Sequence, residues 1–513
     1  MAEPGQTRER RRRRAAASRP SAPTSRYRRL ENPFPPIPLL SEDEVAHLHR
    51  AALEILQRHG IRVLHPEARE LFVAAGARVD GETDLVFLEP ALVTSALASA
   101  PSSFELIARN PERTVTIGGR SLVTVPVSSP PAVSDLDHGK RDGNLADFRE
   151  LVKLTQFFDV LHVTGPCVEP QDVPLQDRHL ESGLTYLTLT DKVPYLYARG
   201  RGQVADGFEL FRIAYGVDRE TFESGPRCYT VINSNSPRQL DVPMCAGLID
   251  FARAGQLSVI TPFTLAGAMA PVSLAGALAL QHAEALAGIA LTQLVRPGAP
   301  VVYGAFTSNV DMKSGAPAFG TPEYYKAALA SGQLARHLGL PYRSSAPNAS
   351  NAVDAQAMYE TMMSLFGAVS GGCNILLHAA GWLEGGLTAS KEKLILDVEV
   401  LQMVAETFRP VVVDEAELAL DAIAETPPGG HFFGGAHTLE RYRTAFYEPL
   451  VSDWANFGQW TEAGAIDATR RANAIWKRAL EEFQQPPLDD AIAAELAEFV
   501  ERRRREGGAL PES

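Results

Sequence analysis

Three side chains that can do chemistry follow one another closely in NILLHAAGWLEGGLTASKEK, residues 374–393. An apolar run leads to His378, and a Gly-Trp-Leu-Glu-Gly-Gly turn then presents Trp382 and Glu384. An imidazole can hydrogen-bond a substrate carboxylate or orient a neighbouring side chain. Because a purely structural turn rarely needs both an aromatic ring and a carboxylate, His378 and Glu384 are candidate catalytic residues. A satisfied core histidine is an equal alternative for His378.

Other aromatic residues stand where predicted strands end: Phe263, Tyr303 and Phe306. Together with Trp382 they could form a set of aromatic faces, which is how proteins hold a quaternary ammonium group through cation–π attraction. An aromatic residue at a strand end more often fills the core, and this is the alternative for each of them. The carboxylates of Asp311 and Asp354 lie in the same group of loops and could offset the charge of a cationic ligand. A helix cap or a turn is the alternative for each of them.

Small residues dominate these loops. Glycine lets the backbone approach a large ligand closely, although tight turns need it as well. The candidate glycines for contact with a bulky partner group are Gly267, Gly315, Gly320, Gly385 and Gly386.

The elements that must position these residues repeat regularly. Short β-rich runs alternate with helix-length segments, and they start about 30–43 residues apart, which is typical of strand–helix units in a parallel sheet. The runs are 159–165, 193–199, 227–233, 257–263, 299–305, 340–346 and 373–379. They predict an α/β fold with a (β/α)₈ TIM barrel over residues 151–430, whose functional groups gather at the C-terminal strand ends. The eighth strand is ambiguous, and residues 409–414 are one candidate.

The rest of the chain divides into three predicted parts. Residues 1–30 read as a disordered arginine-rich tail, and residues 31–150 as an N-terminal α+β cap region. Within the cap, residues 41–60 predict a helix that begins with a Ser41–Glu44 capping box and ends at Gly60. Residues 431–513 predict a mainly helical C-terminal region that provides packing or oligomer surface.

Composition narrows the function classes. The formal charge is −13, and because residues 1–30 hold ten arginines against two glutamates, the remaining body is strongly acidic. An acidic body argues against a nucleic-acid enzyme. The longest apolar stretch, 274–291, is interrupted by polar residues and reads as a buried helix, so we expect no membrane partner. No secretory signal is recognisable, and we expect a cytoplasmic protein.

Metal and nucleophile motifs are not apparent in the sequence. The four cysteines lie far apart, without metal-ligand spacing, and we expect reduced buried thiols and no metal site. His431 and His437 are loosely spaced and make a weak alternative. No G-x-S-x-G elbow, P-loop, HExxH or dinucleotide-binding fingerprint occurs.

Several long segments resemble the trimethylamine methyltransferase superfamily. They include TPFTLAGAMAPVSLAGALALQHAEALAGIALTQLVRPGAPVVYG, SNVDMKSGAPAFGTPEYYKA, LLHAAGWLEGGLTASKEKLILD and PGGHFFGGAHTLERYRTAFYEPLVSDW. The similarity runs from about residue 30 to 503. The resemblance implies a (β/α)₈ barrel that moves a methyl group from a methylated amine to the Co(I) of a corrinoid. The corrinoid belongs to a separate partner protein, so no permanently bound cofactor is expected. A homo-oligomer, commonly hexameric, is also implied.

The founding members of this family carry pyrrolysine in the barrel mouth. Here the corresponding region, about 343–356, reads RSSAPNASNAVDAQ and holds standard residues only. The chain is therefore similar to the non-pyrrolysine branch, which resembles glycine betaine methyltransferase and implies a quaternary amine substrate. A quaternary nitrogen already carries its positive charge, so the enzyme's task reduces to positioning one N-methyl group.

In that interpretation the aromatic and acidic side chains fix the cation. A carboxylate at the far end of the ligand could be held by His378. The alternatives for this role are the polar groups of Asn233, Arg343 and Gln356, and Gln356 is also a candidate catalytic residue. The glycine-rich loops would leave room for the corrin. Two alternatives stay open: a quaternary-amine-binding barrel without catalysis, and a methyltransferase for another methylated amine or acceptor.

Overall fold

The computed structural model describes residues 25–512. The predicted tail lies mostly outside this range, but its last residues are ordered. Ser25–Tyr27 form a short 3₁₀ turn, and β1 (Leu30–Glu31) pairs antiparallel with β7 (Ser121–Thr124). Tyr27 is buried, and its hydroxyl donates to Glu406 Oε1 at 2.8 Å. The tail boundary at residue 30 is therefore wrong, because a buried aromatic anchors the chain from residue 27.

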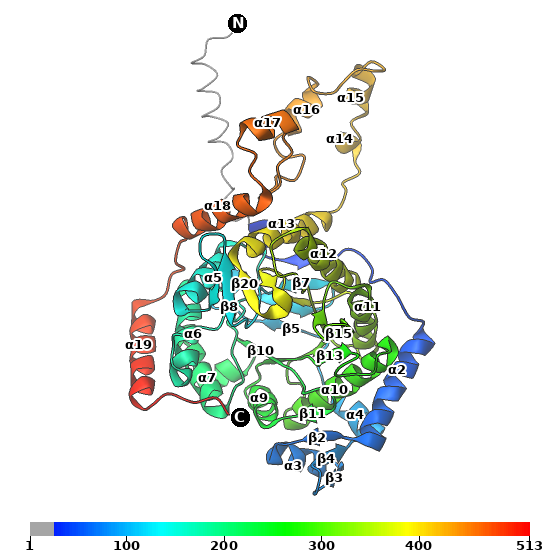
Figure 1. Ribbon diagram of the computed structural model, residues 1–513, viewed down its shortest axis with the longest axis vertical. Coiled ribbons are helices and arrows are strands. Elements are labelled where there is room, and N and C mark those ends of the chain that lie inside the picture. The colour runs from blue at the N-terminus through cyan, green and yellow to red at the C-terminus, as the bar shows by residue number, and fades with distance from the viewer. Residues whose placement is uncertain (1–24, 513) are drawn as a thin grey trace.

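A parallel sheet forms the centre of the molecule, surrounded by helices (Figure 1). Its order is β1-β7-β18-β17-β14-β12-β10, and every pair except β1–β7 is parallel. Apart from β1 and β7, its strands are β10 (Tyr229–Ile232), β12 (Leu257–Ile260), β14 (Val301–Gly304), β17 (Tyr342–Ser345) and β18 (Ile375–Leu377). Most of their residues are buried, as expected for parallel strands covered by helices.

Backbone pairing continues beyond the two ends of this sheet. Tyr195 bridges Tyr229 of β10 in parallel, and Val193 bridges Val163 in parallel. The amide of His162 then donates to the carbonyl of Thr124 in β7 at 3.0 Å. Eight chain segments are thus each paired with the next through backbone contacts. The path starts at β7, passes through β18 and the other strands, and comes back to β7.

The candidate for the eighth strand, residues 409–414, is wrong. That segment contains no strand, and Val411, Val412 and Val413 are exposed. The strand that pairs with β18 at this position is β7, and Ile375 of β18 pairs with Val123 of β7. β7 lies inside the predicted N-terminal cap, so residue 150 does not separate the cap from the main sheet.

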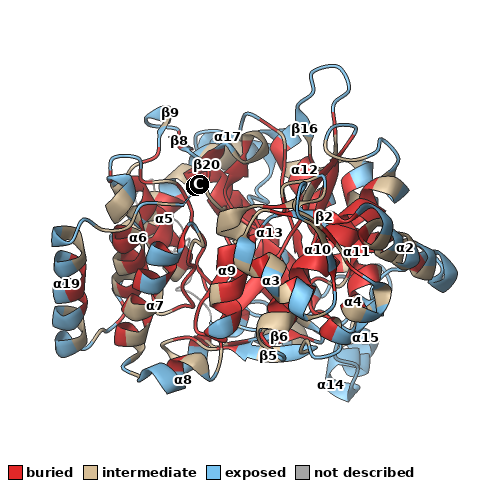
Figure 2. Ribbon diagram, turned by 90° about the horizontal axis from the view of Figure 1, so that it is seen from below, coloured by how far each residue is buried: buried red, intermediate tan, exposed pale blue. Residues whose placement is uncertain are grey.

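Helices cover the parallel segments on the outside (Figures 1 and 2). They are α5 (Leu145–Phe157), α6 (Leu175–Leu189), α7 (Arg201–Tyr215), α8 (Arg219–Glu223), α9 (Val242–Arg253), α10 (Leu274–Val295), α11 (Pro322–His337), α12 (Ala355–Ser370) and α13 (Lys391–Thr407). Several begin at a side-chain cap, such as Ser273 for α10 and Thr321 for α11. α10 is long and apolar enough to cross a membrane, but 83% of its most apolar window is buried inside the protein. The prediction of a buried helix at 274–291 is confirmed.

Smaller sheets flank the main one. The first is β11-β2-β4-β3, packed with three helices, and a second is the β5–β6 pair. The bounds are α2 (Glu42–Glu54), β2 (Ile61–Val63), α3 (Pro66–Ala74), β3 (Arg78–Asp80), β4 (Leu85–Phe87), α4 (Pro90–Leu97), β5 (Ser103–Leu106), β6 (Val115–Gly118) and β11 (Gln239–Leu240). The capping box predicted for α2 is present, and the helix continues as a π-helical turn to His59 before Gly60.

Two sheets follow the C-terminal ends of the main strands. One has the order β13-β15-β16, and the other β19-β20-β8-β9. They consist of β8 (Ala132–Asp135), β9 (Gly139–Asp142), β13 (Phe263–Ala266), β15 (Phe306–Val310), β16 (Pro317–Ala318), β19 (Trp382–Leu383) and β20 (Thr388–Ser390). They bring the predicted site loops together.

The C-terminal part holds four short helices and two longer ones; the predicted helical region from residue 431 contains four of them, whereas α14 and α15 lie before it, in the range that was predicted as barrel. They are α14 (Glu415–Leu418), α15 (Leu420–Glu425), α16 (Ala436–Arg441), α17 (Phe457–Glu462), α18 (Ala468–Glu481) and α19 (Asp490–Arg505). α18 packs on α5 and α13, and α19 packs on α6 and α7. Residues 409–466, here called the arm, project away from the rest of the molecule (Figure 1).

Candidate active site

His378 stands directly after β18, at the C-terminal end of the parallel sheet. Its backbone has a φ of 54°, a left-handed conformation that turns the chain sharply out of the strand. The side chain is buried, and its ring lies 4.1 Å from the Trp382 ring and 5.5 Å from the Phe306 ring. Burial, and then the charge of Arg343, hold the pKa of His378 well below 6.5, so the imidazole is neutral. Among the described residues, its Nδ1 has no hydrogen-bond partner.

An aromatic cluster surrounds this imidazole. The Phe306 ring is 5.1 Å from that of Phe263 and 6.2 Å from that of Trp382. Phe319 completes the cluster, stacked on Phe306 at 5.3 Å and edge-on to Trp382 at 6.3 Å. The structure thus brings together the predicted Phe263, Phe306 and Trp382. Phe319, which follows β16, was not predicted, although an aromatic residue in a glycine-rich loop was a signal for it.

Tyr303 does not belong to this cluster. Its hydroxyl contacts Gln281 Nε2 at 3.0 Å and His282 Nδ1 at 2.8 Å, and both partners lie on α10. Successive strand residues point to opposite faces. The Tyr303 side chain points outward, to the face of the sheet that the helices cover. Its assignment to the substrate site is therefore wrong.

Arg343 lies deeper in the same sheet, on β17. Only 1% of the residue is exposed, and its Cζ lies 5.3 Å from the centre of the Phe306 ring. Nη1 donates to the carbonyl of Ala305 at 3.3 Å, whereas Nε has no partner within the described chain. Burial lowers the pKa of Arg343 from 12.5 to about 10, and tyrosine and cysteine side chains are the groups that counteract this. Among the described residues no carboxylate pairs with Arg343, and a buried cation without such a partner is costly.

A hydrogen-bond network fixes the Trp382 segment. The indole Nε1 donates to the carbonyl of Asn348 at 3.0 Å, and Asn348 Nδ2 donates back to the carbonyl of Trp382 at 2.6 Å. The amide of Gly381 donates to Asp397 Oδ2 at 2.9 Å, and Asp397 forms a buried ion pair with Lys393. The aromatic wall is therefore held rigidly from behind.

Two of the candidate glycines are required by the protein's own packing. Gly386 has a φ of 102°, and a Cβ there would lie 2.5 Å from Cη2 of Trp382. At Gly320, with a φ of 72°, a Cβ would lie 2.4 Å from the Cα of Glu360. Gly315 faces open space in an exposed turn. A role for these glycines, and for Gly267 and Gly385, in approach of a corrin stays a prediction.

The candidate carboxylates and Gln356 stand outside the aromatic cluster. Glu384 forms an ion pair with Lys140 of β9 at 2.5 Å, and hydrogen bonds from Lys140 and then Thr388 lower its pKa. Asp311 is exposed and accepts from the Ser314 hydroxyl within its own turn at 2.6 Å. These contacts are structural.

Three further candidates also lie at the periphery. Asp354 caps α12 by accepting from the amide of Ala357, and Gln356 donates to Glu360 at 2.9 Å on the same helix. Asn233 is exposed directly after β10. The placement of Asp354 favours the helix-cap alternative over a role in the site, and Gln356 is occupied by Glu360 of its own helix.

A polar cluster at neighbouring strand ends was not predicted. The Tyr197 hydroxyl donates to Glu169 Oε1 at 2.7 Å and contacts the hydroxyl of Ser129. Arg199 Nη2 lies 3.1 Å from the same Glu169 oxygen, and the Tyr195 ring is 5.0 Å from that of Tyr197. The signal was available, because Tyr197 and Arg199 stand near the end of the run VPYLYAR and Glu169 lies in the loop CVEPQDV.

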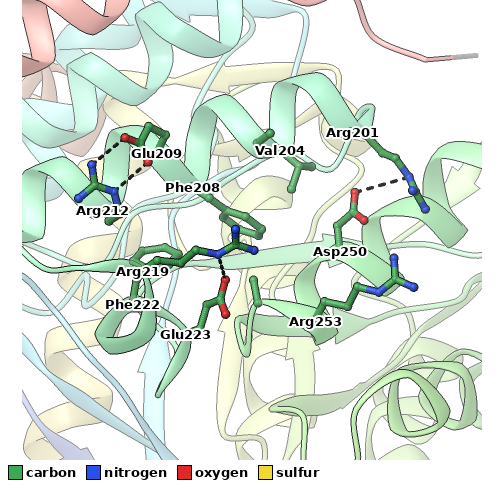
Figure 3. A pocket seen from close by; sticks show the side chains of 12 residues that line it. Arg201, Val204, Phe208, Glu209, Arg212, Arg219, Phe222, Glu223, Asp250 and Arg253 are labelled. Carbon is green, nitrogen blue, oxygen red and sulfur yellow. Dashed lines mark hydrogen bonds and ion pairs between the residues drawn. The ribbon is translucent and has the colours of Figure 1, made fainter.

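An open cleft lies elsewhere, between α7, α8 and α9 (Figure 3). It has a volume of about 650 Å³, and Phe208 and Phe222 are among its lining residues. Its arginines are paired with carboxylates, for example Arg219 with Glu223 at 2.6 Å. None of the predicted site residues lines it, and it presents no uncompensated charge to a ligand.

One group of possible metal ligands occurs in the described chain: Asp135, Asp137 and His138. Arg141 and Lys391 neutralise Asp135, and Lys477 neutralises Asp137. These contacts make the group part of an ion-pair network. His431 and His437 belong to no such group among the described residues.

Comparisons with known proteins agree with this picture. A family model described as "Trimethylamine methyltransferase (MTTB)" matches residues 6–508. The chain is 37% identical over 477 residues to a glycine betaine methyltransferase of Desulfitobacterium hafniense (strain Y51), covering 93% of this chain and 99% of the relative. It is 30% identical over 473 residues to the trimethylamine methyltransferase MttB of D. hafniense (strain DSM 10664 / DCB-2), covering 91% and 94%.

Among solved structures, the monomethylamine methyltransferase MtmB of Methanosarcina barkeri aligns over 88% of this chain and 90% of its own. Its TM-score is 0.49 and its sequence identity is 10%. The family match spans nearly the whole chain, and it agrees with the motifs at the C-terminal strand ends. The chain belongs to the trimethylamine methyltransferase (MTTB) family.

Proposed function

We propose that this protein is a corrinoid-dependent methyltransferase that takes a methyl group from a betaine-like quaternary amine. The acceptor is the Co(I) of a corrinoid carried by a separate protein. Family membership supports the reaction class, and the 37% identical glycine betaine methyltransferase supports a quaternary substrate. We further propose that the eight linked parallel segments form a closed (β/α)₈ barrel with the aromatic cluster at its mouth.

The observation that carries the substrate class is the buried guanidinium of Arg343, which lies beneath an aromatic cluster and pairs with no carboxylate of residues 25–512. A betaine is a zwitterion with an onium group at one end and a carboxylate at the other. The guanidinium of Arg343 matches the carboxylate, and the aromatic rings match the onium group. Phe306 contacts both: Arg343 Cζ is 5.3 Å from its ring centre, and the rings of Phe319 and Trp382 pack around it. Aromatic faces attract the onium group without offering it a donor. The carboxylate would supply the counter-charge that Arg343 lacks.

The protein's part in the chemistry is positioning. The bond between the methyl carbon and nitrogen breaks, its electron pair leaves with the nitrogen as a neutral tertiary amine, and the corrinoid substrate supplies the attacking electron pair. Because the departing amine needs no proton, a neutral His378 suits this site. The rigid Trp382 wall fixes the onium group so that one methyl group points outward.

The surface around the mouth is suited to a protein partner. Val272, Met312 and Leu387 are exposed on loops that follow the main strands, and Val272 is 74% exposed. Gly267 lies against Met312, whose sulfur would be 3.0 Å from a Cβ at that position. We assign this rim to the docking of the corrinoid protein.

The direct test is methyl transfer from purified protein to free Co(I) cobalamin, followed by the absorbance change of methylcobalamin formation. Glycine betaine and other carboxylated quaternary amines should support turnover. Trimethylamine should not, because it has neither a fixed charge nor a carboxylate. Turnover with trimethylamine alone would refute the substrate class, and binding of betaines without any methyl transfer would refute the catalytic function.

A further inference from the structure

A buried ion pair lies directly behind the Trp382 wall. Lys393 and Asp397 are 0% and 2% exposed, and they stand four residues apart on α13, so their side chains share one face of the helix. Burial lowers the pKa of Lys393 and raises the pKa of Asp397, because removal from water disfavours the charged form of each group. The two charges compensate one another, but taking both of them out of water is unfavourable.

An ion pair of this kind is a poor source of fold stability. When a buried pair is replaced by apolar side chains of similar volume, the protein is often equally stable or more stable. Loss of one partner alone is strongly destabilising, because the other charge is then buried without compensation. The contacts of Lys393 and Asp397 show what else the pair does.

Asp397 holds the residue through which the chain enters the aromatic wall. Gly381 precedes Trp382, the first residue of β19, and has a φ of 91°, a conformation that glycine adopts readily. Its amide donates to Asp397 Oδ2 at 2.9 Å, and its carbonyl accepts from the amide of Ser390 at 2.9 Å. A hydrogen bond to an ionised acceptor is stronger than a neutral one. Since glycine is the most flexible residue, the bond to Asp397 fixes the direction in which the chain continues to Trp382.

Lys393 reaches the same wall by a second path. Its Nζ donates to Thr361 Oγ1 of α12 at 2.9 Å as well as to Asp397. Asn348 Nδ2 donates to the same hydroxyl oxygen at 3.2 Å and to the carbonyl of Trp382 at 2.6 Å. The ion pair is thus linked to the backbone both before and after the Cα atom of Trp382.

The position of the Trp382 ring decides how the site can hold an onium group. The ring lies 4.1 Å from that of His378 and 6.2 Å from that of Phe306, so a small rotation of its backbone would change both contacts. A displacement of about 1 Å can slow a reaction that depends on positioning by about 100-fold. Firm support of this stretch of backbone is therefore part of the site.

We propose that Lys393 and Asp397 are positioning residues of the substrate site, whose ion pair fixes Gly381 and thereby the orientation of the Trp382 ring. Asp397 supplies the acceptor for Gly381, and Lys393 keeps that acceptor ionised and in place. Because the pair supports the same site, this role rests on the function proposed above. The pair should determine the affinity for quaternary amines while contributing little to the stability of the fold.

Two matched double variants separate the acceptor from the charges. Lys393→Met/Asp397→Leu removes both charges and the acceptor, whereas Lys393→Met/Asp397→Asn removes both charges but keeps a side-chain oxygen for the amide of Gly381. Leucine and asparagine have shapes similar to that of aspartate, so the packing is preserved. In titration calorimetry with tetramethylammonium, the Kd of the leucine variant should be about 10-fold higher than that of the parent or more, because an unanchored wall is less pre-organised. The Kd of the asparagine variant should stay within about threefold of the parent, since the acceptor is kept.

Stability measurements distinguish positioning from a purely structural role. Differential scanning fluorimetry should place the Tm of the leucine variant within about 4 °C of the parent, because removal of two buried charges offsets the loss of a hydrogen bond. Hydrogen–deuterium exchange of the ligand-free proteins adds a readout that needs no substrate. The peptide that contains Gly381 should exchange about 10-fold faster in the leucine variant and at the parent's rate in the asparagine variant, because only leucine leaves the amide of Gly381 without an acceptor.

The results separate failure of this role from failure of the proposed function. Equal affinities of the leucine variant and the parent would overturn the positioning role, and so would equal losses of affinity in the two variants. A Tm of the leucine variant that falls together with its affinity, or unchanged exchange at Gly381, would also contradict it. A parent that binds no quaternary amine would refute the proposed function and this role together, whereas a parent that binds, with unaffected variants, would refute this role alone.

Discussion

Replacing Arg343 by Met should affect folding stability and ligand binding in opposite directions, because the buried charge destabilises the ligand-free protein but binds the carboxylate of the ligand. Methionine has a similar volume and no charge, so it can fill the space beneath Phe306 while removing the guanidinium. The pKa of Arg343 falls from 12.5 to about 10 through burial, which means that the folded state disfavours the charged form. A shift of this size corresponds to roughly 3 kcal/mol.

The sign of the stability change follows from this shift. Because the folded pKa lies below the unfolded one, the penalty acts fully at every pH below about 10, including neutral pH. Arg343→Met should therefore stabilise the ligand-free protein by about 1–3 kcal/mol, after the loss of the hydrogen bond to Ala305. Differential scanning fluorimetry should show a higher Tm for the variant than for the parent at pH 7.

Ligand binding should move in the opposite direction. Removing one partner of a buried charge pair typically costs about 2–5 kcal/mol, so the Kd for glycine betaine should rise by about 30-fold or more. Tetramethylammonium has the onium group but no carboxylate, and its Kd should change less than threefold, or about 0.7 kcal/mol. Titration calorimetry with both ligands measures the difference. An unchanged affinity for glycine betaine, or equal losses for both ligands, would refute the role assigned to Arg343.

Three further predictions concern the surrounding structure. Trp382→Ala should weaken binding of tetramethylammonium by about 30-fold, corresponding to a desolvated cation–π contact of ~2 kcal/mol, while Trp382→Phe keeps an aromatic face and most of the affinity; equal affinities for the two variants would contradict a cation–π contact. Gly386→Ala should lower the Tm clearly more than Gly315→Ala, because both positions have positive φ but only the former meets the Trp382 ring; equal losses of Tm would show that backbone strain alone matters. His162 is buried and neutral, with its pKa lowered to about 4 by desolvation, so the stability that it contributes should be lost as the pH falls from about 6.5 to 4; the Tm of the parent should fall through this window more than that of His162→Gln, and parallel pH profiles would argue against it.

Much of the main sheet follows from the order of strand and helix signals. Apolar runs such as LSVITPF and CNILLHA sit between helical segments at regular spacing, and β12 and β18 lie within them. β7 was assigned to the α+β cap and not to the main sheet, because it is short, with the sequence SLVT, and because it precedes the first helical unit of the repeat. Its place is set by pairing with β18, about 250 residues later, which no local pattern can reveal.

The candidate site was predictable only in part. Phe263, Phe306, Trp382 and His378 cluster because all four follow strands of one parallel sheet. Which face a strand residue takes depends on the register of the whole sheet, and this is why Tyr303 was misassigned. The depth of a side chain depends on tertiary packing too: Arg343 was expected beside the ligand's far end, but nothing in its sequence context showed that it is buried without a counter-ion.

The pairing of β7 with both β18 and the His162 segment has a consequence during protein synthesis. The ribosome makes Ser121–Thr124 long before Ile375–Leu377, so the nascent chain carries β7 with one unsatisfied edge while some 250 residues emerge. An open strand edge is a template for intermolecular association. Chains released before residue 377 should therefore be prone to aggregate, and the central sheet can be completed only after Ile375–Leu377 have left the ribosome.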